Sequence, residues 1–159
     1  MDRAKNGCKR HVIADADGLP LLVECTPANI RDDTVFVAML DSLPPVKMPG
    51  SGPPRYKPAK AVGDAAYGHD YIIRQVVARR IHPLLAPRSK PGQPPVSHGS
   101  GLGKVRYVIE RSLAWLASFR RIAQCYECTG ASWQAFNDLA CCIICAQRLS
   151  KIERKKIAA

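Results

Sequence analysis

The sequence predicts an α/β fold in which a β-hairpin precedes strands that are connected by helices. The turn signal Asp17-Gly18 separates two short segments of strand character, which is the pattern of a hairpin. Farther along, short apolar segments alternate with segments whose apolar residues recur at helical spacing. The chain has 159 residues, of which 47% are apolar, so one domain with a sizeable core is expected.

Two strands and a tight turn are expected near the beginning of the chain. Residues 11–16 form the first predicted strand and residues 19–26 the second. Asp17-Gly18 between them predicts a type I′ turn, in which both central residues have positive φ. The preceding residues 1–9 are polar and are expected to be irregular.

A helix and a proline-rich loop come next. Asp32 or Asp33 is suited to cap a helix that extends to Leu43, because a carboxylate accepts hydrogen bonds from N–H groups of the first turn. Residues 44–58 contain six prolines and two glycines, which predicts an exposed loop.

The middle of the chain has the order strand, helix, strand. Residues 60–64 and 81–86 are the predicted strands, and residues 70–80 form the helix between them. Residues 87–103 are rich in proline, glycine and serine and predict a second long loop. Long loops in a compact domain are often functional.

The last part of the chain is predicted to be mainly helical. Residues 104–121 form a helix, residues 122–128 a short strand, and residues 132–150 a helix that is apolar on most faces and therefore buried. Residues 151–159 form a charged tail. The expected apolar face of the first of these helices consists of Val105, Val108, Ile109, Leu113, Leu116 and Phe119.

The charge balance favours polyanionic partners. The chain has 24 Lys and Arg residues against 13 acids, a formal net charge of +11. Nucleic acid is the first partner class that such a surplus indicates, and an anionic membrane surface is the second. No apolar run approaches the roughly 20 residues of a transmembrane helix, and no apolar signal core stands at the N-terminus. We therefore expect a cytoplasmic protein with no membrane partner, in which the seven cysteines are free thiols.

Two acidic residues stand out by their positions. Glu110 is the only acid between Asp70 and Glu127, and basic residues surround it. Asp64 follows a predicted strand, at the edge where α/β sheets bind ligands. A structural explanation is available for both, since Asp64 can cap the next turn and Glu110 can pair with Arg106 one helical turn earlier.

The alternative explanation is metal binding. Two carboxylates that converge from different elements in a basic environment can hold a hydrated divalent cation such as Mg²⁺. A pair of such ions can activate a water or hydroxyl and stabilise the leaving oxygen of a phosphodiester. Nearby arginines would then hold the backbone phosphates, because a guanidinium group matches a phosphate with two parallel hydrogen bonds.

Several segments, in order along nearly the whole chain, resemble DDE-type insertion-sequence transposases, with the insertion-sequence-five group as the nearest. The pattern Glu-Arg-x-x-Ala-Trp-Leu-x-x-Phe-Arg-Arg is the most specific of them. The segments are Asp2-Arg-Ala-Lys-Asn-Gly-Cys-Lys-Arg-His11, Asp17-Gly-Leu-Pro-Leu21, Ala28-Asn-Ile-Arg-Asp-Asp33, Gly63-Asp-Ala-Ala-Tyr-Gly68, Val108-Ile-Glu-Arg-Ser-Leu-Ala-Trp-Leu116 and Phe119-Arg-Arg121.

The resemblance implies a ribonuclease H-like fold and a metal-binding Asp-Asp-Glu triad that uses Mg²⁺ or Mn²⁺. Asp64 and Glu110 would be its second and third members, and Arg106 matches the arginine of the family signature. The signature's tyrosine would fall on Gly103 and is absent, and its downstream basic residue would fall on Ala117. The residues that we expect to contact DNA are Lys9, Arg10, Lys104, Arg106, Arg111, Arg120 and Arg121.

The first aspartate of the triad has no obvious counterpart. In the family it lies on a strand before the hairpin, whereas Asp2 is in a polar stretch and Asp15 is on a hairpin strand. We therefore expect residues 1–150 to be a partial ribonuclease H-like catalytic domain that lacks its first strand, from a truncated or split-frame transposase. Alone it should be catalytically impaired and prone to aggregation, because the sheet edge is unpaired.

Its expected partners are DNA, as transposon ends and target, and an upstream transposase segment or a second copy of the chain, in the bacterial nucleoid. An alternative is a non-catalytic basic DNA-binding remnant. A third reading, a zinc-ribbon interaction module, rests on the cysteines alone. These are Cys125, Cys128, Cys141, Cys142 and Cys145.

Overall fold

The computed structural model describes residues 7–47, 52–86, 101–127 and 129–157, with side chains omitted at 101–106 and 155–157. The chain divides into two compact units, although its length alone suggested one domain. Unit 1 consists of Met1–Asn29 and Val108–Ala159, and unit 2 of Ile30–Tyr107. Each unit is described separately below.

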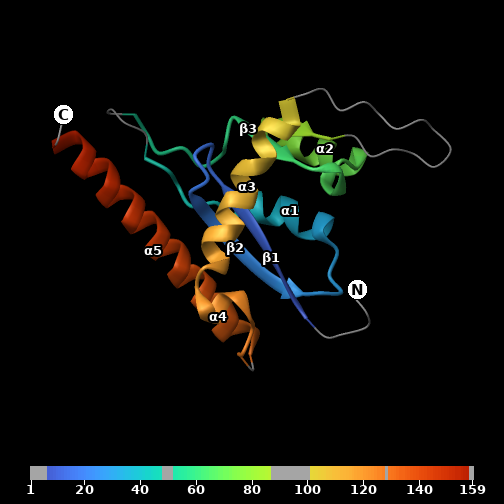
Figure 1. The fold of residues 1–159 in the computed structure, drawn as a ribbon. Helices are drawn as coiled ribbons and strands as arrows, with labels where there is room; N and C mark the ends of the chain where they lie inside the picture. Colours follow the sequence, from blue (N-terminus) through green and yellow to red (C-terminus); the bar gives the residue numbers. More distant parts are fainter. Residues whose placement is uncertain (1–6, 48–51, 87–100, 128, 158–159) are drawn as a thin grey trace. The chain divides into compact units, whose positions relative to one another are not determined.

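The elements follow one another as in Figure 1. Helix α3 contains the boundary between the two units. Unit 1 holds β1 (Cys8–Ala14), β2 (Pro20–Pro27), most of α3 (Gly101–Ala117), α4 (Arg120–Ala123) and α5 (Gly130–Ile157). Unit 2 holds α1 (Asp32–Asp41), β3 (Lys60–Gly63), the 3₁₀ turn η1 (Ala65–Tyr67), α2 (Asp70–Ala78) and β4 (His82–Leu85).

The predicted hairpin at the start of unit 1 is confirmed, but its turn is of another type. Strands β1 and β2 pair antiparallel, with Val12 opposite Val23. Only Gly18 of the turn has positive φ, at 77°, so the type I′ prediction is wrong. The Asp15 carboxylate accepts hydrogen bonds from the N–H groups of Asp17 (2.9 Å) and Leu19 (2.8 Å). These bonds favour a wider turn that needs a glycine at one position only.

The hairpin turn packs closely against α3. A side chain at Gly18 would place its Cβ 2.9 Å from an Arg111 nitrogen, so the end of the arginine side chain would have to shift. Ser112 is fully buried at this point and donates a hydrogen bond of 2.7 Å to the Gly18 carbonyl. The predicted apolar face is therefore wrong at one position, because Ser112 faces inward and Leu113 is 37% exposed.

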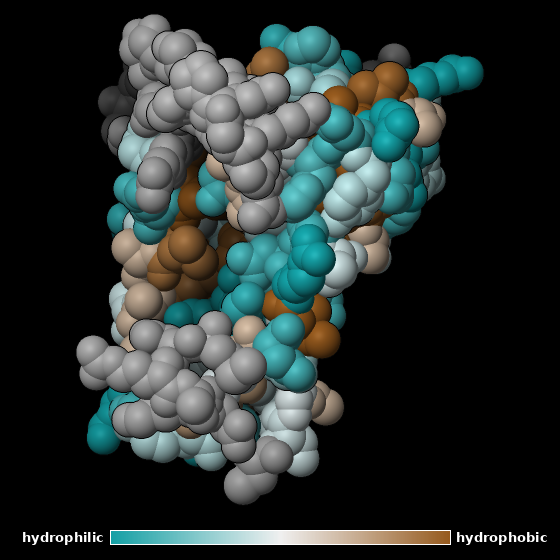
Figure 2. All heavy atoms as spheres, turned by 90° about the vertical axis from the view of Figure 1, so that its right-hand side faces the viewer, coloured by the Kyte–Doolittle hydropathy of each residue, from teal (hydrophilic) through white to brown (hydrophobic). Residues whose placement is uncertain are grey.

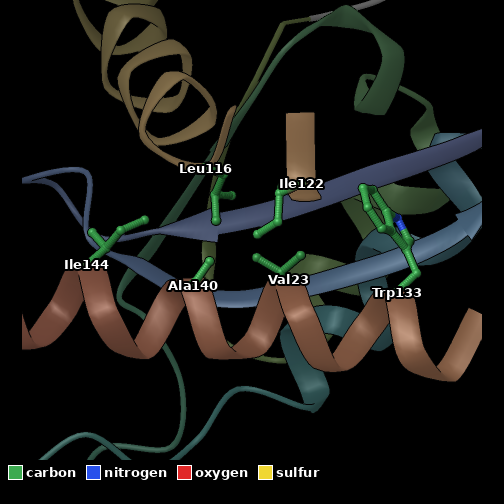
Figure 3. Close-up of a cluster of buried hydrophobic side chains, with 6 residues drawn as sticks. All are labelled: Val23, Leu116, Ile122, Trp133, Ala140 and Ile144. Atoms are coloured by element: carbon green, nitrogen blue, oxygen red, sulfur yellow. The ribbon is translucent and has the colours of Figure 1, made fainter. Parts of the chain in front are cut away.

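A cluster of apolar side chains from four elements forms the core of unit 1 (Figure 3). They come from β2, α3, α4 and α5 and point toward one another. Burying each large side chain of this kind contributes about 1.5–3 kcal/mol. The residues are Val23, Leu116, Ile122, Trp133, Ala140 and Ile144.

The side chain of Gln134 fastens α5 to β2. Its amide nitrogen donates to the Val23 carbonyl at 2.7 Å, and its amide oxygen accepts from the Cys25 N–H at 2.8 Å. These two backbone groups lie on the edge of β2 that does not pair with β1, because outward-pointing groups alternate along a strand. Gln134 thus satisfies part of that edge.

Helix α5 is longer and less buried than the sequence predicted. It extends to Ile157, so the segment predicted as a charged tail, residues 151–159, is helical where it is described. Only one stripe of the helix is buried, and the helix also carries large apolar side chains that are exposed. On the face of the molecule that Figure 2 shows, apolar side chains likewise interrupt the hydrophilic surface. The exposed ones on α5 are Leu139, Ile143, Leu149 and Ile152.

The strand predicted at residues 122–128 is not formed in its described part, residues 122–127. The Phe119 carbonyl accepts hydrogen bonds from the N–H groups of Ile122 (2.9 Å) and Ala123 (2.8 Å), which closes the short helix α4. Burial of Ile122 in the core favours this turn. The following residues, through Glu127, have no regular structure.

Unit 2 contains the predicted strand-helix-strand unit. Strands β3 and β4 are parallel, with α2 as the connection between them (Figure 1). Helix α1 begins at Asp32 with Arg31 in the N-cap position, and it ends at Asp41 rather than Leu43. The predicted cap is wrong because the Asp33 side chain is engaged elsewhere, as described below. The expected loop at 44–58 holds one isolated bridge, between Val46 and Arg55.

The described residues form two separate two-stranded sheets, β1–β2 and β3–β4. The α/β class is therefore confirmed at the level of small sheets and helices. None of the helices, within the described part, is long and apolar enough to cross a membrane.

Candidate metal and nucleic-acid sites

Asp64 stands at the carboxyl end of β3, directly before η1. It is exposed, and its Oδ1 accepts a hydrogen bond of 2.9 Å from the Ala66 N–H, which caps the turn. The structural explanation foreseen for this residue is therefore correct. It leaves a ligand role open, because a carboxylate has a second oxygen and further lone pairs.

Several carboxylates act electrostatically on Tyr67, three residues after Asp64. The ring of Tyr67 is partly buried and lies 4.7 Å from that of Phe36, centroid to centroid. Burial, and then the charges of Asp32, Asp64 and Asp33, raise the pKa of Tyr67 to about 12. Carboxylates from α1 and from the end of β3 thus act on the same phenol.

A polar cluster of unit 2 centres on Asp33, which the sequence suggested as a helix cap. Its carboxylate is 5% exposed and accepts hydrogen bonds from Tyr71 (2.7 Å) and Arg31 (3.1 and 2.5 Å). His69 Nε2 lies 3.5 Å from the same carboxylate. Burial opposes ionisation of Asp33, but these hydrogen bonds and positive charges outweigh it and lower its pKa.

This cluster joins the first turn of α1 to the first turn of α2. Asp33 and Tyr71 are 38 positions apart, and no spacing rule links them. The nearby Arg31 was the only hint in the sequence. The cluster helps to hold the segment between β3 and α2, on which Asp64 lies.

Glu110 is exposed on α3, within unit 1. Ala114 and Ala117, which follow it at helical spacing, are also exposed, so the side of the helix that carries Glu110 has little bulk. Its predicted ion pair with Arg106 lies outside the described side chains, as does the side chain of Lys104.

The chemistry of the two carboxylates fits a hard cation such as Mg²⁺, which binds through one or two carboxylates plus water and phosphate oxygens. Asp64 belongs to unit 2 and Glu110 to unit 1, and each is described within its own unit. Among the described side chains, no three His, Cys, Asp or Glu residues gather as a metal site.

Two of the arginines predicted to contact DNA lie over tryptophan rings in unit 1. The guanidinium of Arg10 lies 5.9 Å from the Trp133 ring, and that of Arg111 lies 5.2 Å from Trp115. Arg111 also donates a hydrogen bond of 2.6 Å to the Asp17 carbonyl. Both arginines therefore stabilise the unit, and Arg10 is only partly exposed.

Arg120 and Arg121 line an open pocket together with Tyr126. The Arg121 side chain is 63% exposed, lies 4.8 Å over the Phe136 ring, and stands 3.7 Å from the Glu127 carboxylate. Stacking on a ring orients a guanidinium group and leaves its charge in place. Lys9, on β1, is partly exposed.

The cysteines in the described residues are free thiols. Burial, with smaller electrostatic contributions, raises the pKa of Cys25 and of Cys141 to about 12, as expected of small core residues. Cys8 and Cys125 are exposed, and burial followed by the charge and hydrogen bond of Cys125 raises the pKa of Cys8. Cys128, one residue of the suggested zinc module, lies outside the described residues.

Comparison with known proteins identifies the class of this chain. Residues 2–145 match the family described as the transposase DDE domain. The chain therefore belongs to this family, and the predicted DDE-type insertion-sequence transposase is confirmed.

Two curated relatives carry the same designation. The chain is 37% identical over 153 residues to a candidate transposase of insertion sequence element IS402 from Burkholderia cepacia, which covers 96% of this chain and 69% of the relative. It is 29% identical over 137 residues to a candidate transposase of element IS6501 from Brucella ovis, covering 86% of this chain and 95% of that relative. No solved structure matches the chain significantly.

Proposed function

We propose that the chain is a catalytic part of a DNA transposase, which binds transposon ends and target DNA and takes part in phosphodiester cleavage and strand transfer. The observation that carries this proposal is the position of Asp64, an exposed carboxylate at the carboxyl end of a parallel strand pair, in a chain of the DDE family. Ligands of open α/β sheets bind at that end.

Asp64 and Glu110 are the proposed catalytic metal ligands. DDE transposases generally use divalent metal ions, and oxygen ligands in a phosphate-rich site suit Mg²⁺ or Mn²⁺. The ion, when bound, would supply the charge that activates a nucleophile and stabilises the leaving oxygen. The second oxygen of Asp64 is available for this role beside its turn-capping hydrogen bond.

Basic side chains of β1, α3 and α4 are the proposed DNA contacts. Arg120 and Arg121 are exposed and line one pocket, which makes them the strongest candidates. Arg10 and Arg111 stack on tryptophans, which fixes the orientation of their guanidinium groups. They would contribute mainly through the electrostatic field of these fixed charges. The remaining proposed contacts are Lys9, Lys104 and Arg106.

We further propose a partial ribonuclease H-like domain over residues 1–150. Strands β1–β2 and β3–β4 are separate pairs in the described residues, which agrees with two parts of one sheet whose connecting strand comes from elsewhere. An upstream segment of the transposase, or a second copy of the chain, would supply that strand and the first aspartate. The cation would then have three carboxylates.

The test is strand cleavage of terminal-repeat DNA in Mg²⁺ by the isolated chain and by the chain joined to an upstream segment. We expect no cleavage by the isolated chain and restored cleavage by the joined one. Asp64→Asn and Glu110→Gln should each abolish the restored activity, at least 100-fold, because a metal ligand is lost. Glu153→Gln, at an exposed acid on α5, is the matched control and should retain it.

Robust cleavage by the isolated chain would disprove the partial-domain proposal but leave the transposase function intact. The alternative function, a non-catalytic DNA-binding remnant, rests on the net charge of +11 and the exposed arginines. It predicts metal-independent DNA binding and no cleavage even when the upstream segment is joined.

A further inference from the structure

A basic pocket in unit 2 is not explained by the site described above. It lies where the loop before β3 passes the C-terminal end of α2 and has a volume of about 680 Å³. Half of its lining residues are Lys or Arg, and they come from two separate parts of the chain. The lining residues are Arg55, Tyr56, Lys57, Pro58, Ala59, Ala78, Arg79 and Arg80.

The pocket has a clear excess of positive charge. Arg79 is held by Asp41 through two hydrogen bonds, of 2.7 and 2.6 Å, so its charge is offset and its side chain is fixed. Arg55, Lys57 and Arg80 are exposed and have no acid paired with them in the salt bridges of the described residues. The hydrogen bond from Arg79, and to a smaller extent the charges of Arg79 and Lys57, lower the pKa of Asp41. Three cations thus surround one fixed guanidinium.

The backbone holds this arrangement in place. Arg55 forms two backbone hydrogen bonds with Val46, each of 2.8 Å, which ties down the loop on one side of the pocket. The His82 N–H donates to the Ala59 carbonyl at 3.0 Å on the other side. The loop is therefore anchored at both ends of its basic segment.

Arg80 occupies a position where glycine would be expected. The end of α2 has the Schellman pattern, since the N–H of Ile81 donates to the Val76 carbonyl at 3.3 Å and that of Arg80 to the Val77 carbonyl at 2.8 Å. Arg80 has φ of 61°, which is unfavourable for any side chain with a Cβ. Stability alone would favour glycine here, so the arginine side chain calls for another explanation.

We propose that this pocket binds backbone phosphates of duplex DNA and is a second DNA-contacting surface besides the arginines of α3 and α4. The proposal rests on the proposed DNA-binding function of the chain. A guanidinium forms paired hydrogen bonds with phosphate oxygens, and the exposed Tyr56 hydroxyl provides a further donor. The surface recognises phosphate, and so it contributes affinity without sequence preference.

A purely structural role for Arg80 is the competing explanation, because a cation at the C-terminal end of a helix interacts favourably with the helix dipole. The variant Arg80→Gly separates the two. It removes the side chain at a backbone position that glycine tolerates best. We expect Tm to rise by ~2–4 °C, the shift that relief of strain gives in a chain of this size, and DNA binding to weaken.

The experiment measures the affinity of the full chain for a fluorescent duplex of the terminal repeat, and for a random duplex of equal length, at several salt concentrations. The slope of log affinity against log salt reports the number of phosphates contacted, about 0.9 per contact. Arg80→Gly should reduce the slope by about 1 for both duplexes. The triple variant Arg55→Gln, Lys57→Gln, Arg80→Gln should reduce it by about 2–3 and weaken binding at least 10-fold at physiological salt.

Matched controls remove the same charge elsewhere. Arg74→Gln is at an exposed position of α2 that does not line the pocket, and the triple control adds Lys151→Gln and Arg154→Gln on α5. Both should leave the slope within about 0.5 and the affinity within about 2-fold.

Three results would overturn the proposal. If the pocket variants bind DNA as their matched controls do, the proposal is overturned and the proposed transposase function is left in place. A lower Tm of Arg80→Gly with unchanged DNA binding would assign Arg80 to the helix end alone. If the unmodified chain bound neither duplex, the proposed function would fail first and this surface with it. Should the triple variant not fold, Arg80→Gly decides the question by itself.

Discussion

The two units fix their arginines in different ways. In unit 1, Arg10, Arg111 and Arg121 lie over aromatic rings, and Arg121 also stands 3.7 Å from the Glu127 carboxylate. In unit 2, Arg31 and Arg79 are bound to aspartates. A ring orients a guanidinium without cancelling its charge, whereas a carboxylate cancels it. The net charge of the chain therefore overstates the positive charge that unit 2 can present to a polyanion. Unit 2 can bind a polyanion only where its remaining exposed cations lie close together.

The stability of the units also has different origins. Unit 1 depends on an apolar cluster from four elements. Unit 2 is also stabilised by the buried carboxylate of Asp33, which accepts hydrogen bonds from Tyr71 and Arg31. The loss of stability caused by a substitution should therefore depend on pH differently in unit 1 and in unit 2. Local unfolding should also distinguish the two units.

The largest effect is expected from Leu116→Ala in the core of unit 1. Leu116 is fully buried, so the substitution leaves a cavity and should lower the free energy of unfolding by about 3–5 kcal/mol. Urea denaturation measures this loss, and hydrogen exchange shows where protection falls. Equal loss of protection in both units would mean that they unfold together, and their stability would then not have different origins.

A smaller effect is expected from Asp33→Asn in unit 2. The substitution removes charge-assisted hydrogen bonds from Arg31 and Tyr71 and should cost about 2 kcal/mol at pH 7. Because the folded pKa of Asp33 is lowered, its stabilising contribution is present above the unfolded pKa of about 3.9 and is lost as pH falls through the folded pKa.

The difference between Asp33→Asn and the unmodified chain should therefore shrink below about pH 4. Urea denaturation from pH 3 to 8 measures it. Asp70→Asn, at an exposed acid in the first turn of α2, is the control and should stay within about 0.5 kcal/mol. A difference independent of pH would mean that the Asp33 charge contributes nothing.

The smallest effect concerns thiol labelling, which reports on unit 1 alone because all seven cysteines lie outside residues 30–107. The pKa of Cys25 and of Cys141 is about 12, so in the folded chain both should react with iodoacetamide far more slowly at pH 8 than the exposed Cys142. Leu116→Ala should accelerate their labelling and Asp33→Asn should not. Peptide mass spectrometry follows each cysteine.

The hairpin, the strand-helix-strand unit and α3 follow from local rules. Glycine at a turn, period-two and period-3.6 patterns and strand length depend on neighbouring residues, and the structure agrees with them. The predicted end of the helix at residue 121 is wrong, because α3 ends at Ala117 and α4 begins at Arg120. The failures involve distant partners. Ser112 is inward because the Gly18 carbonyl accepts a hydrogen bond from its hydroxyl, and residues 122–127 do not form a strand because Ile122 enters the core formed with α5 and β2.

Part of the candidate site could be predicted from the sequence, because that part also depends on local patterns. Asp64 and Glu110 follow from their position relative to a strand and to a helix face, and family membership agrees with the sequence motifs that contain them. The Asp33 cluster and the pocket around Arg80 need side chains that only folding brings together. A positive φ at an arginine leaves no mark in the sequence.

The amide of Gln134 has a consequence for how the hairpin can grow. By occupying the Val23 carbonyl and the Cys25 N–H it imitates one peptide group of an absent neighbour, so β2 cannot template another strand at these positions. Extension of this sheet on the β2 side, whether by assembly or by misassembly, is therefore hindered at these positions by a single glutamine.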